Sequence, residues 1–233
     1  EVPYTGSGVL ASALAMDKAM AKTLFRQVGV QTADWIFIEE RIDRLTPRFL
    51  DRVRRSIGFP LVVKPNNEGS TVGFSVVQDE QQLLPALKFA QSYGLETLIE
   101  KYIPGRELTV SILEDRVLPV IEIVPKRGVY DYESKYTKGM TEYLVPAQLD
   151  DAVSHYLQDQ ALKAFQVLKC TDYARVDFRL RPDGEIYCLE VNTLPGMTET
   201  SLVPKAARAA GIEFNDLIEK ILQMALQRRN KKS

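Results

Sequence analysis

Residues 175–192 read RVDFRLRPDGEIYCLEVN, a stretch with the pattern of a β-hairpin. Asp183-Gly184 is a strong signal for a two-residue turn between antiparallel strands. Centring the turn there predicts the apolar cross-strand pairs Val176–Val191, Phe178–Leu189 and Leu180–Tyr187. Because side chains alternate between the two faces of a strand, these pairs share one face, which we expect to be buried in the core.

The other face of this hairpin carries opposed charges. Asp177 is predicted to lie opposite Glu190, and Arg175 opposite Asn192. Two facing carboxylates repel, because their Cβ atoms lie only ~5 Å apart. A divalent cation would reverse that repulsion, and carboxylate and amide oxygens are ligands that Mg²⁺ accepts together with phosphate oxygens. The pattern predicts a metal site with room for two ions ~4 Å apart; the alternative is a solvent-exposed polar face where the charges meet by chance.

A lysine and a glycine-containing loop precede the hairpin in the sequence. Lys64 ends the apolar stretch 60–64 and is followed by NNEGSTVG at 66–73. Such a loop can direct several backbone N–H groups at phosphate oxygens, and a lysine adds positive charge there. The spacing differs from GxxxxGK[ST], so a P-loop fold is not indicated. Alone, the loop is weak evidence for a phosphate-binding site, because most Gly-Ser loops are only turns.

The segment LIEKYIPG at 98–105 is predicted to be a strand that ends at Pro104-Gly105. We interpret it as a hinge between two lobes, with exposed backbone groups that could bind the edge of a purine. Glu107 follows and could accept hydrogen bonds from ribose hydroxyls. The alternative is an ordinary strand followed by a turn.

Strands and helices mix along the chain without a strict βαβ alternation, which favours an α+β fold of two lobes with mainly antiparallel sheets. We predict strands at 34–39, 60–64, 74–77, 95–102, 106–114 and 117–124, and helices at 8–28, 46–58, 79–93, 150–168, 202–210 and 214–226. The first lobe is expected at 1–103, with a linker remnant at 1–8, and the second at 104–233. The polar segment 125–146 is a predicted loop, and loops of this length are usually functional or disordered; we expect it to act as a lid that nucleotide orders. A cleft between two lobes is a common place for a ligand.

The composition argues against several classes of function. The 233 residues carry a formal net charge of −1, with 45% apolar and 26% charged residues, so nothing favours nucleic acid as a partner. No apolar run is long enough to predict a membrane helix. Cys170 and Cys188 do not form a disulfide framework and are expected to stay reduced, which predicts a cytoplasmic protein. His155 is the only histidine, which argues against a histidine-based triad or a zinc site.

Further motifs follow one another along nearly the whole chain. They are YTGSG (4–8), MDK (16–18), VVKP (62–65), EGSTVG (68–73), YDYESKY (130–136), RVDF (175–178), LEVNTLPGMT (189–198) and SLVPKAA (201–207). With the EKYI hinge and the acidic hairpin, in this order, they resemble the ATP-grasp superfamily and most closely its D-alanine–D-alanine ligase family. The resemblance implies an ATP-grasp fold in which two lobes hold ATP between them.

The resemblance also implies roles for individual residues. Those matched to nucleotide ligands are Lys18 and Lys64 for the phosphates, Lys135 for the terminal phosphate, Glu100, Lys101 and Ile103 for adenine, and Glu107 for ribose. Those matched to ligands of two Mg²⁺ ions, or of Mn²⁺ in their place, are Asp177, Glu190 and Asn192. The remaining matches are Arg175 and the backbone at Gly196 for a tetrahedral intermediate, Ser70 and Tyr136 for ordering a mobile loop, and Ser201 and Leu202 for the second D-alanine.

The implied reaction joins two D-alanine molecules through an acyl phosphate, with ATP converted to ADP, and its product serves peptidoglycan synthesis. One alternative is a ligase with another acceptor such as D-lactate, although Tyr136 after Lys135 favours an amine. Another is a nucleotide-binding module without ligase activity. The expected partners are D-alanine and ATP, and a homodimer is left open.

The resemblance also implies an N-terminal domain of roughly 80–90 residues, an ordinary size for a small domain. In the family that domain carries a glutamate that helps to bind the first D-alanine. Nothing in this sequence matches it. We therefore expect the chain alone to bind ATP and Mg²⁺ but to form little dipeptide.

Overall fold

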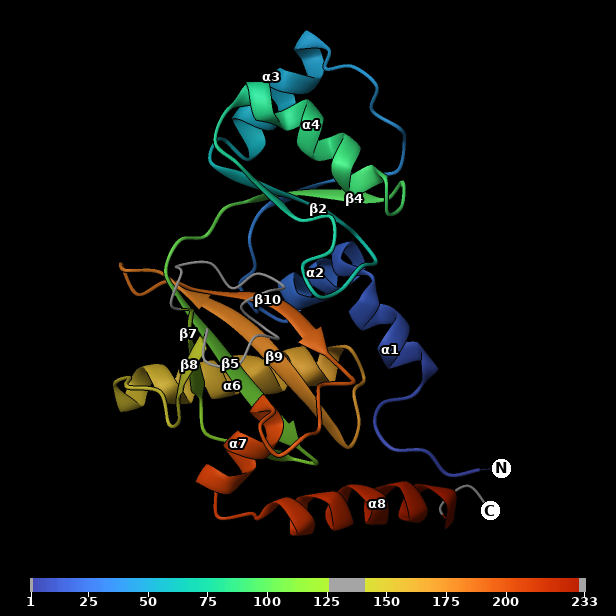
Figure 1. The fold of residues 1–233 in the computed structure, drawn as a ribbon, viewed down its shortest axis with the longest axis vertical. Coiled ribbons are helices and arrows are strands. Elements are labelled where there is room, and N and C mark those ends of the chain that lie inside the picture. The colour runs from blue at the N-terminus through green and yellow to red at the C-terminus, as the bar shows by residue number, and fades with distance from the viewer. Residues whose placement is uncertain (1, 126–140, 231–233) are drawn as a thin grey trace.

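The computed structural model describes residues 2–125 and 141–230. It confirms an α+β fold with antiparallel sheets, arranged as two lobes that lie one above the other in Figure 1. The segment 126–140 lies outside the described residues, and with it the predicted site residues Lys135 and Tyr136. Within the described residues, no helix combines the length and the apolar character that a membrane span requires.

The first lobe is a four-stranded antiparallel sheet with two helices on one face (Figure 1). The strands lie in the order β1 (Trp35–Ile38), β4 (Thr97–Lys101), β2 (Leu61–Pro65) and β3 (Ser75–Val77). The helices are α3 (Pro47–Ser56) and α4 (Glu80–Gln91). Their apolar side chains meet those of the strands in a core whose most buried members include Val53, Leu83, Leu87 and Ile99.

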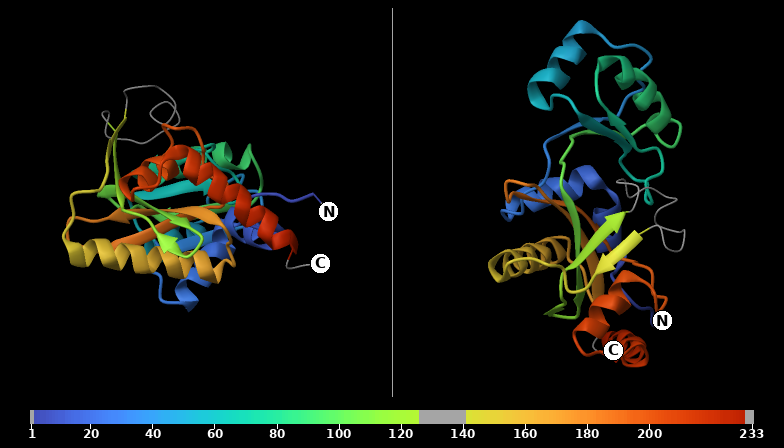
Figure 2. Two further views of the ribbon diagram at one scale, coloured as in Figure 1. Left: turned by 90° about the horizontal axis from the view of Figure 1, so that it is seen from below. Right: turned by 60° about the vertical axis from the view of Figure 1, so that its left-hand side comes forward.

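The second lobe is built on a larger antiparallel sheet. Its strands lie in the order β10 (Ile186–Asn192), β9 (Tyr173–Leu180), β5 (Arg106–Leu113), β7 (Ile121–Pro125) and β8 (Thr141–Leu144), with β6 (Arg116–Val117) paired to β5. Adjacent residues of β5 enter different cores: Ile112 packs with α6 (Asp151–Val167), and Leu113 packs with α7 (Leu202–Ala209) and α8 (Phe214–Asn230). The sheet therefore has helices on both faces, as the views of Figure 2 show.

Side-chain caps set where three helices begin. The Thr46 hydroxyl accepts a hydrogen bond from the Phe49 N–H at the start of α3, and the Asp79 carboxylate caps α4 in the same way. Asp17 caps α2 (Lys18–Gln27) and accepts from the Met20 N–H. Because its own backbone is extended, the helix expected at 8–28 is divided into α1 (Val9–Met16) and α2.

Helices α1 and α2 pack with the second lobe, although they precede the first lobe in the chain. Ala11, Ala15, Ala21 and Phe25 lie in the same core as the apolar residues of β5, β9 and α6. We therefore propose that the second lobe consists of residues 9–30 together with the chain after 104, and that the first lobe comprises 34–103. The lobe boundary expected from sequence order alone, at 103/104, instead assigns these two helices to the first lobe, which follows them in the chain.

The hairpin of β9 and β10 follows the expected register over only part of its length. Asp177 pairs with Glu190, Val176 with Val191 and Arg175 with Asn192. Nearer the turn the expected pairs were wrong: a bulge at Leu189 shifts the register by one residue, so the observed pairs are Phe178–Cys188 and Leu180–Ile186. The expected register would have turned Ile186 and Cys188 toward the polar face, whereas the bulge buries both in the core.

The last residues of the predicted loop 125–146 include a strand. Thr141–Leu144 forms β8, which pairs antiparallel with β7, Glu122 lying opposite Leu144. Strand β8 is four residues long and lies at the edge of the sheet, beside β7. Its partner strand β7 contributes Ile121 and Ile123 to the core beneath α7 and α8.

Gly105 lies where the chain passes from the first lobe into β5, and its lack of a side chain is required there. Its φ is +134°, and a Cβ at this position would lie 2.1 Å from the backbone carbonyl oxygen of Leu180. We expect Gly105→Ala to lower the free energy of unfolding by about 3 kcal/mol or more, since the backbone must move. Urea unfolding measures the change. Gly94→Ala is the control, because a Cβ at Gly94 meets no atom within 4 Å; equal stability of the two variants would contradict the prediction.

Candidate active site

A cleft lies between the two lobes, and most of the residues selected from the sequence line it. Its walls come from β2 and the loop after it, from β4 and the linker 102–105, and from β5, β9 and β10. The selected residues found there are Lys18, Lys64, Ser70, Glu100, Lys101, Ile103, Glu107, Arg175, Asp177 and Glu190. A wider depression near the Pro182–Gly184 turn contains none of the selected residues.

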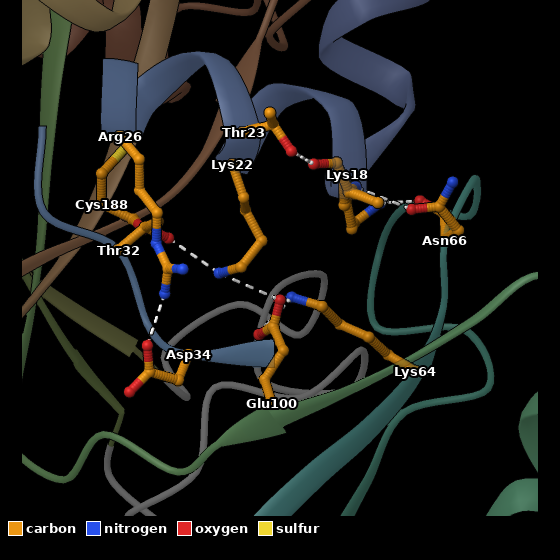
Figure 3. Close-up of polar contacts among 11 residues, drawn as sticks. Lys18, Lys22, Thr23, Arg26, Thr32, Asp34, Lys64, Asn66, Glu100 and Cys188 are labelled. Atoms are coloured by element: carbon orange, nitrogen blue, oxygen red, sulfur yellow. Dashed lines mark hydrogen bonds and ion pairs between the residues drawn. The ribbon is translucent and has the colours of Figure 1, made fainter. Parts of the chain in front are cut away.

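Two lysines and one glutamate form the most buried charged group at the cleft (Figure 3). Glu100, on β4, is 4% exposed. One of its oxygens lies 2.9 Å from Lys64 Nζ and the other lies 3.2 Å from Lys22 Nζ. Burial acts to raise the pKa of Glu100, but the two ammonium groups outweigh it and hold that pKa at about 2. Glu100 is therefore ionised at neutral pH, with two cations beside a single carboxylate.

Lys18 and Asn66 join the start of α2 to the loop after β2 (Figure 3). Lys18 Nζ donates to the backbone carbonyls of Asn66, at 3.2 Å, and Glu68. The fully buried Asn66 side chain accepts from the Ala19 N–H at 2.9 Å and donates to Asp17 Oδ1 at 2.9 Å. Burial lowers the pKa of Lys18, an effect that Glu190 opposes. The glycine-containing loop is thus held against α2 by polar contacts.

The loop itself has an unusual backbone at its tip. Ser70 and Thr71 have φ values of +51° and +65°. Threonine is β-branched and rarely adopts this left-handed conformation. Strain of this kind is concentrated at ligand-binding loops, where the surrounding structure enforces it. The tip of the loop lines the cleft.

The acidic pair of the hairpin lies at the cleft floor. Asp177 is 8% exposed and accepts a 2.6 Å hydrogen bond from the Thr109 hydroxyl. Arg175 donates to both Asp177 oxygens, each at 2.8 Å. Glu190 lies directly opposite on β10, and Asn192 follows on the same face two residues later. The face therefore presents two carboxylates and an amide oxygen, with an arginine against one carboxylate.

A second arginine–carboxylate pair lies beside the acidic pair. Arg179 Nη2 is 2.9 Å from Glu107 Oε2, and both side chains line the cleft. Arg179 is two residues after Asp177 on β9, and therefore on the same face of the strand. Glu107, the residue matched to ribose, is thus held in place by a neighbouring strand.

The residues after β10 lie outside the lining of this cleft. Ser201 Oγ accepts a 3.1 Å hydrogen bond from the Thr198 N–H, and a Cβ added at Gly196 would be 3.0 Å from the same oxygen. Gly196 and Ser201 are therefore neighbours. The Leu202 side chain is buried in the core beneath α7, so only its backbone can reach a substrate. Asn192 Oδ1 accepts from the Leu194 N–H at 3.1 Å, which orients the start of this loop.

Several residues that line the cleft or support its walls were missed in the sequence. Lys22 follows Lys18 by four residues on α2, a spacing that places both on one helix face and could have indicated it. Arg179 could have been found by its two-residue spacing from Asp177. Leu189 lines the cleft because of the bulge, which no sequence pattern indicated. Asn66 had no signal beyond its place in the loop.

Comparison with known proteins gives a consistent result. A family model described as "D-ala D-ala ligase C-terminus" matches residues 24–223. The D-alanine–D-alanine ligase of Syntrophotalea carbinolica is 48% identical over 229 residues, which are 98% of this chain and 72% of that protein. The Bacillus anthracis ligase crystallised with ATP is 37% identical with a TM-score of 0.83, over 100% of this chain and 73% of that one. The VanG D-Ala:D-Ser ligase of Enterococcus faecalis is 30% identical with a TM-score of 0.85, over 96% and 65% of the two chains.

Proposed function

Because the chain belongs to the D-alanine–D-alanine ligase family, we infer that it holds ATP between its two lobes and uses it to join two D-alanine molecules for peptidoglycan synthesis. The observation that carries this inference is the cleft itself. Lysines from α2 and β2 meet an acidic hairpin face across it, which is the arrangement that a polyphosphate with its metal ions requires.

The proposed ATP position follows from the polarity of the cleft walls. Lys18, Lys64 and the backbone N–H groups of the loop after β2 would contact phosphates. Glu100, Lys101 and Ile103 would contact adenine, while Glu107, held by Arg179, would accept hydrogen bonds from ribose hydroxyls. Lys135 is proposed to reach the terminal phosphate, and Ser70 with Tyr136 to order the loop above the substrates. The ligase crystallised with ATP supports the choice of nucleotide.

The donor set at the hairpin fits magnesium. Within residues 2–125 and 141–230, no three His, Cys, Asp or Glu side chains gather as a metal-binding group. Two carboxylates and an amide oxygen, completed by phosphate oxygens and water, match the preferences of Mg²⁺. We propose that Asp177, Glu190 and Asn192 hold two Mg²⁺ ions, or Mn²⁺ in their place, which supply positive charge to the phosphates.

The proposed reaction has two steps. A carboxylate oxygen of the first D-alanine attacks the γ-phosphorus of ATP, and the bond to the β–γ bridging oxygen breaks to give an acyl phosphate and ADP. The amine of the second D-alanine then attacks the acyl carbon, and phosphate leaves as the amine loses a proton. Arg175 and the backbone N–H at Gly196 would stabilise the oxyanion between these events. Ser201 and the Leu202 backbone would position the second D-alanine, so positioning and charge provide most of the catalysis.

The second substrate, which accepts the activated D-alanine, is the part of this function for which a specific alternative exists. The D-Ala:D-Ser ligase VanG shows that proteins of this fold differ in the second substrate. D-Alanine remains the proposed acceptor because the curated relatives that cover most of the chain carry the name D-alanine–D-alanine ligase. We also propose a cytoplasmic location, since the reaction consumes ATP; a homodimer remains a prediction.

The test of the proposed function is ADP release by this chain with ATP, Mg²⁺ and D-alanine, supplied alone or together with D-lactate, D-serine or L-alanine, with the Syntrophotalea carbinolica enzyme as the reference. We expect D-alanine alone to stimulate ADP release and to yield D-alanyl-D-alanine, more slowly than the reference, with no further stimulation by the other three compounds. Further stimulation by D-lactate or D-serine, with a mixed product, would replace the proposed acceptor. Nucleotide binding without stimulation by any acceptor would favour a nucleotide-binding module.

A further inference from the structure

Lys22 is a buried lysine that does not line the cleft. It is 1% exposed and lies on α2, behind Glu100 as seen from Lys64 (Figure 3). Its ammonium group is 3.2 Å from one Glu100 oxygen and donates a 2.7 Å hydrogen bond to the Thr32 hydroxyl. Thr32 in turn donates to the Cys188 carbonyl at 2.8 Å, next to the bulge of β10. Lys22 therefore connects α2, β4 and β10, three of the segments that form or support the cleft.

The charges around Glu100 are unequal. A buried carboxylate needs one cation for neutrality, and Lys64 already provides it at 2.9 Å. If Lys64 were its only partner, that lysine would be neutralised by Glu100 and would attract a phosphate weakly. Burial lowers the pKa of Lys22, and the Glu100 carboxylate opposes that effect. With the Lys22 ammonium on the opposite oxygen, the group of three carries a net positive charge. Lys64 is the member of the group that faces the cleft together with Glu100.

We propose that Lys22 is a positioning residue for nucleotide binding: by engaging Glu100 from behind, it leaves the charge of Lys64 available to the phosphates of ATP. This inference rests on the proposed function. It assigns Lys22 an effect through Glu100 and Lys64, without contact with the nucleotide. A purely structural ion pair would make a different prediction, because its loss would change stability without changing the response to the number of phosphates on the ligand.

The test compares Lys22→Met, Glu100→Gln and the double variant by calorimetry with a non-hydrolysable ATP analogue and Mg²⁺, and with adenosine as a probe that lacks phosphates. Lys22→Met should weaken binding of the ATP analogue about tenfold, the effect expected when a charge-assisted contact is weakened. Adenosine binding should be unchanged. Lys163→Met, which removes a half-buried lysine of α6 that pairs with Asp159, is the control for total charge and should bind the analogue like the parent.

The double variant provides the decisive comparison. Once Glu100 is neutral, it no longer neutralises Lys64, and removing Lys22 has no further effect on that lysine. The double variant should therefore bind the ATP analogue within about twofold of Glu100→Gln, the scatter of independent effects. This comparison stands even if Lys22→Met fails to fold, because the double variant contains no unpaired carboxylate. The inference is overturned if Lys22→Met folds and binds like the parent, if it loses adenosine as strongly as the analogue, or if the double variant binds much more weakly than Glu100→Gln. A folded parent that binds no analogue would overturn the proposed function and this inference with it.

Discussion

Replacing Glu190 with glutamine should lower the Mg²⁺-dependent rate of ADP formation at least about 100-fold. Glu190 lies directly opposite Asp177 in the hairpin, and Asp177 is already held by Thr109 and Arg175. Glutamine keeps the size of the side chain but removes one of two negative charges in the proposed metal site. Charge stabilisation at the phosphates is therefore lost in the step where phosphoryl transfer occurs.

The control for Glu190→Gln is Glu185→Gln on the same hairpin. Glu185 is exposed beyond the turn, where it pairs with Arg181 and accepts from the Tyr187 hydroxyl. Its loss should leave the rate unchanged. Rates are measured as ADP formed over a range of Mg²⁺ concentrations for the parent and both variants. A parental rate for Glu190→Gln at saturating Mg²⁺ would remove the hairpin from the metal site.

Lys64→Met should weaken binding of an ATP analogue with Mg²⁺ by roughly 30- to 100-fold, the upper part of the range for a charge-assisted hydrogen bond. Lys64 is the lysine of the Glu100 group that lines the cleft, and methionine preserves much of its length without the charge. The remaining Lys22–Glu100 pair would be neutral. The effect should therefore exceed the effect of Lys22→Met, which acts indirectly.

Calorimetry also tests the Lys64 prediction, with Lys88→Met as the control. Lys88 is an exposed residue of α4 in the same lobe, so its substitution changes net charge by the same amount away from the cleft. Melting temperatures of both variants establish that they fold. An unchanged dissociation constant for Lys64→Met, with the parent binding normally, would exclude Lys64 from the phosphate site.

The hairpin shows why much of this site could be predicted from the sequence. An Asp-Gly turn and alternating apolar residues predict which residues of the two strands face each other, with an error of at most one position. This precision was enough to place Asp177 opposite Glu190. The bulge at Leu189 was beyond prediction because it results from competition between two burial patterns, with Ile186 and Cys188 both entering the core. Local pattern thus located the carboxylates but not the apolar residue that the bulge adds to the cleft.

Contacts between distant segments could not be predicted in the same way. Nothing local to Phe25 or Ala21 shows that α2 packs with β9 and α6 rather than with the lobe that follows it in the chain. Lys22 looked like one more charged residue of an amphipathic helix, because the carboxylate that it neutralises lies 78 positions later in the sequence, at Glu100. Burial of an ion pair is a tertiary property, and only the packed structure reveals it.

Binding of ATP in the cleft between the lobes can be measured by titration calorimetry of this chain with a non-hydrolysable ATP analogue. The experiment is run with Mg²⁺ and with Mg²⁺ removed by a chelator, on protein shown to be folded by its melting transition. The predicted result is one nucleotide bound per chain, with affinity that falls sharply without Mg²⁺ and in Lys64→Met. If the folded protein binds no analogue in the presence of Mg²⁺, or if Lys64→Met binds it as tightly as the parent, the cleft is not the ATP site proposed here.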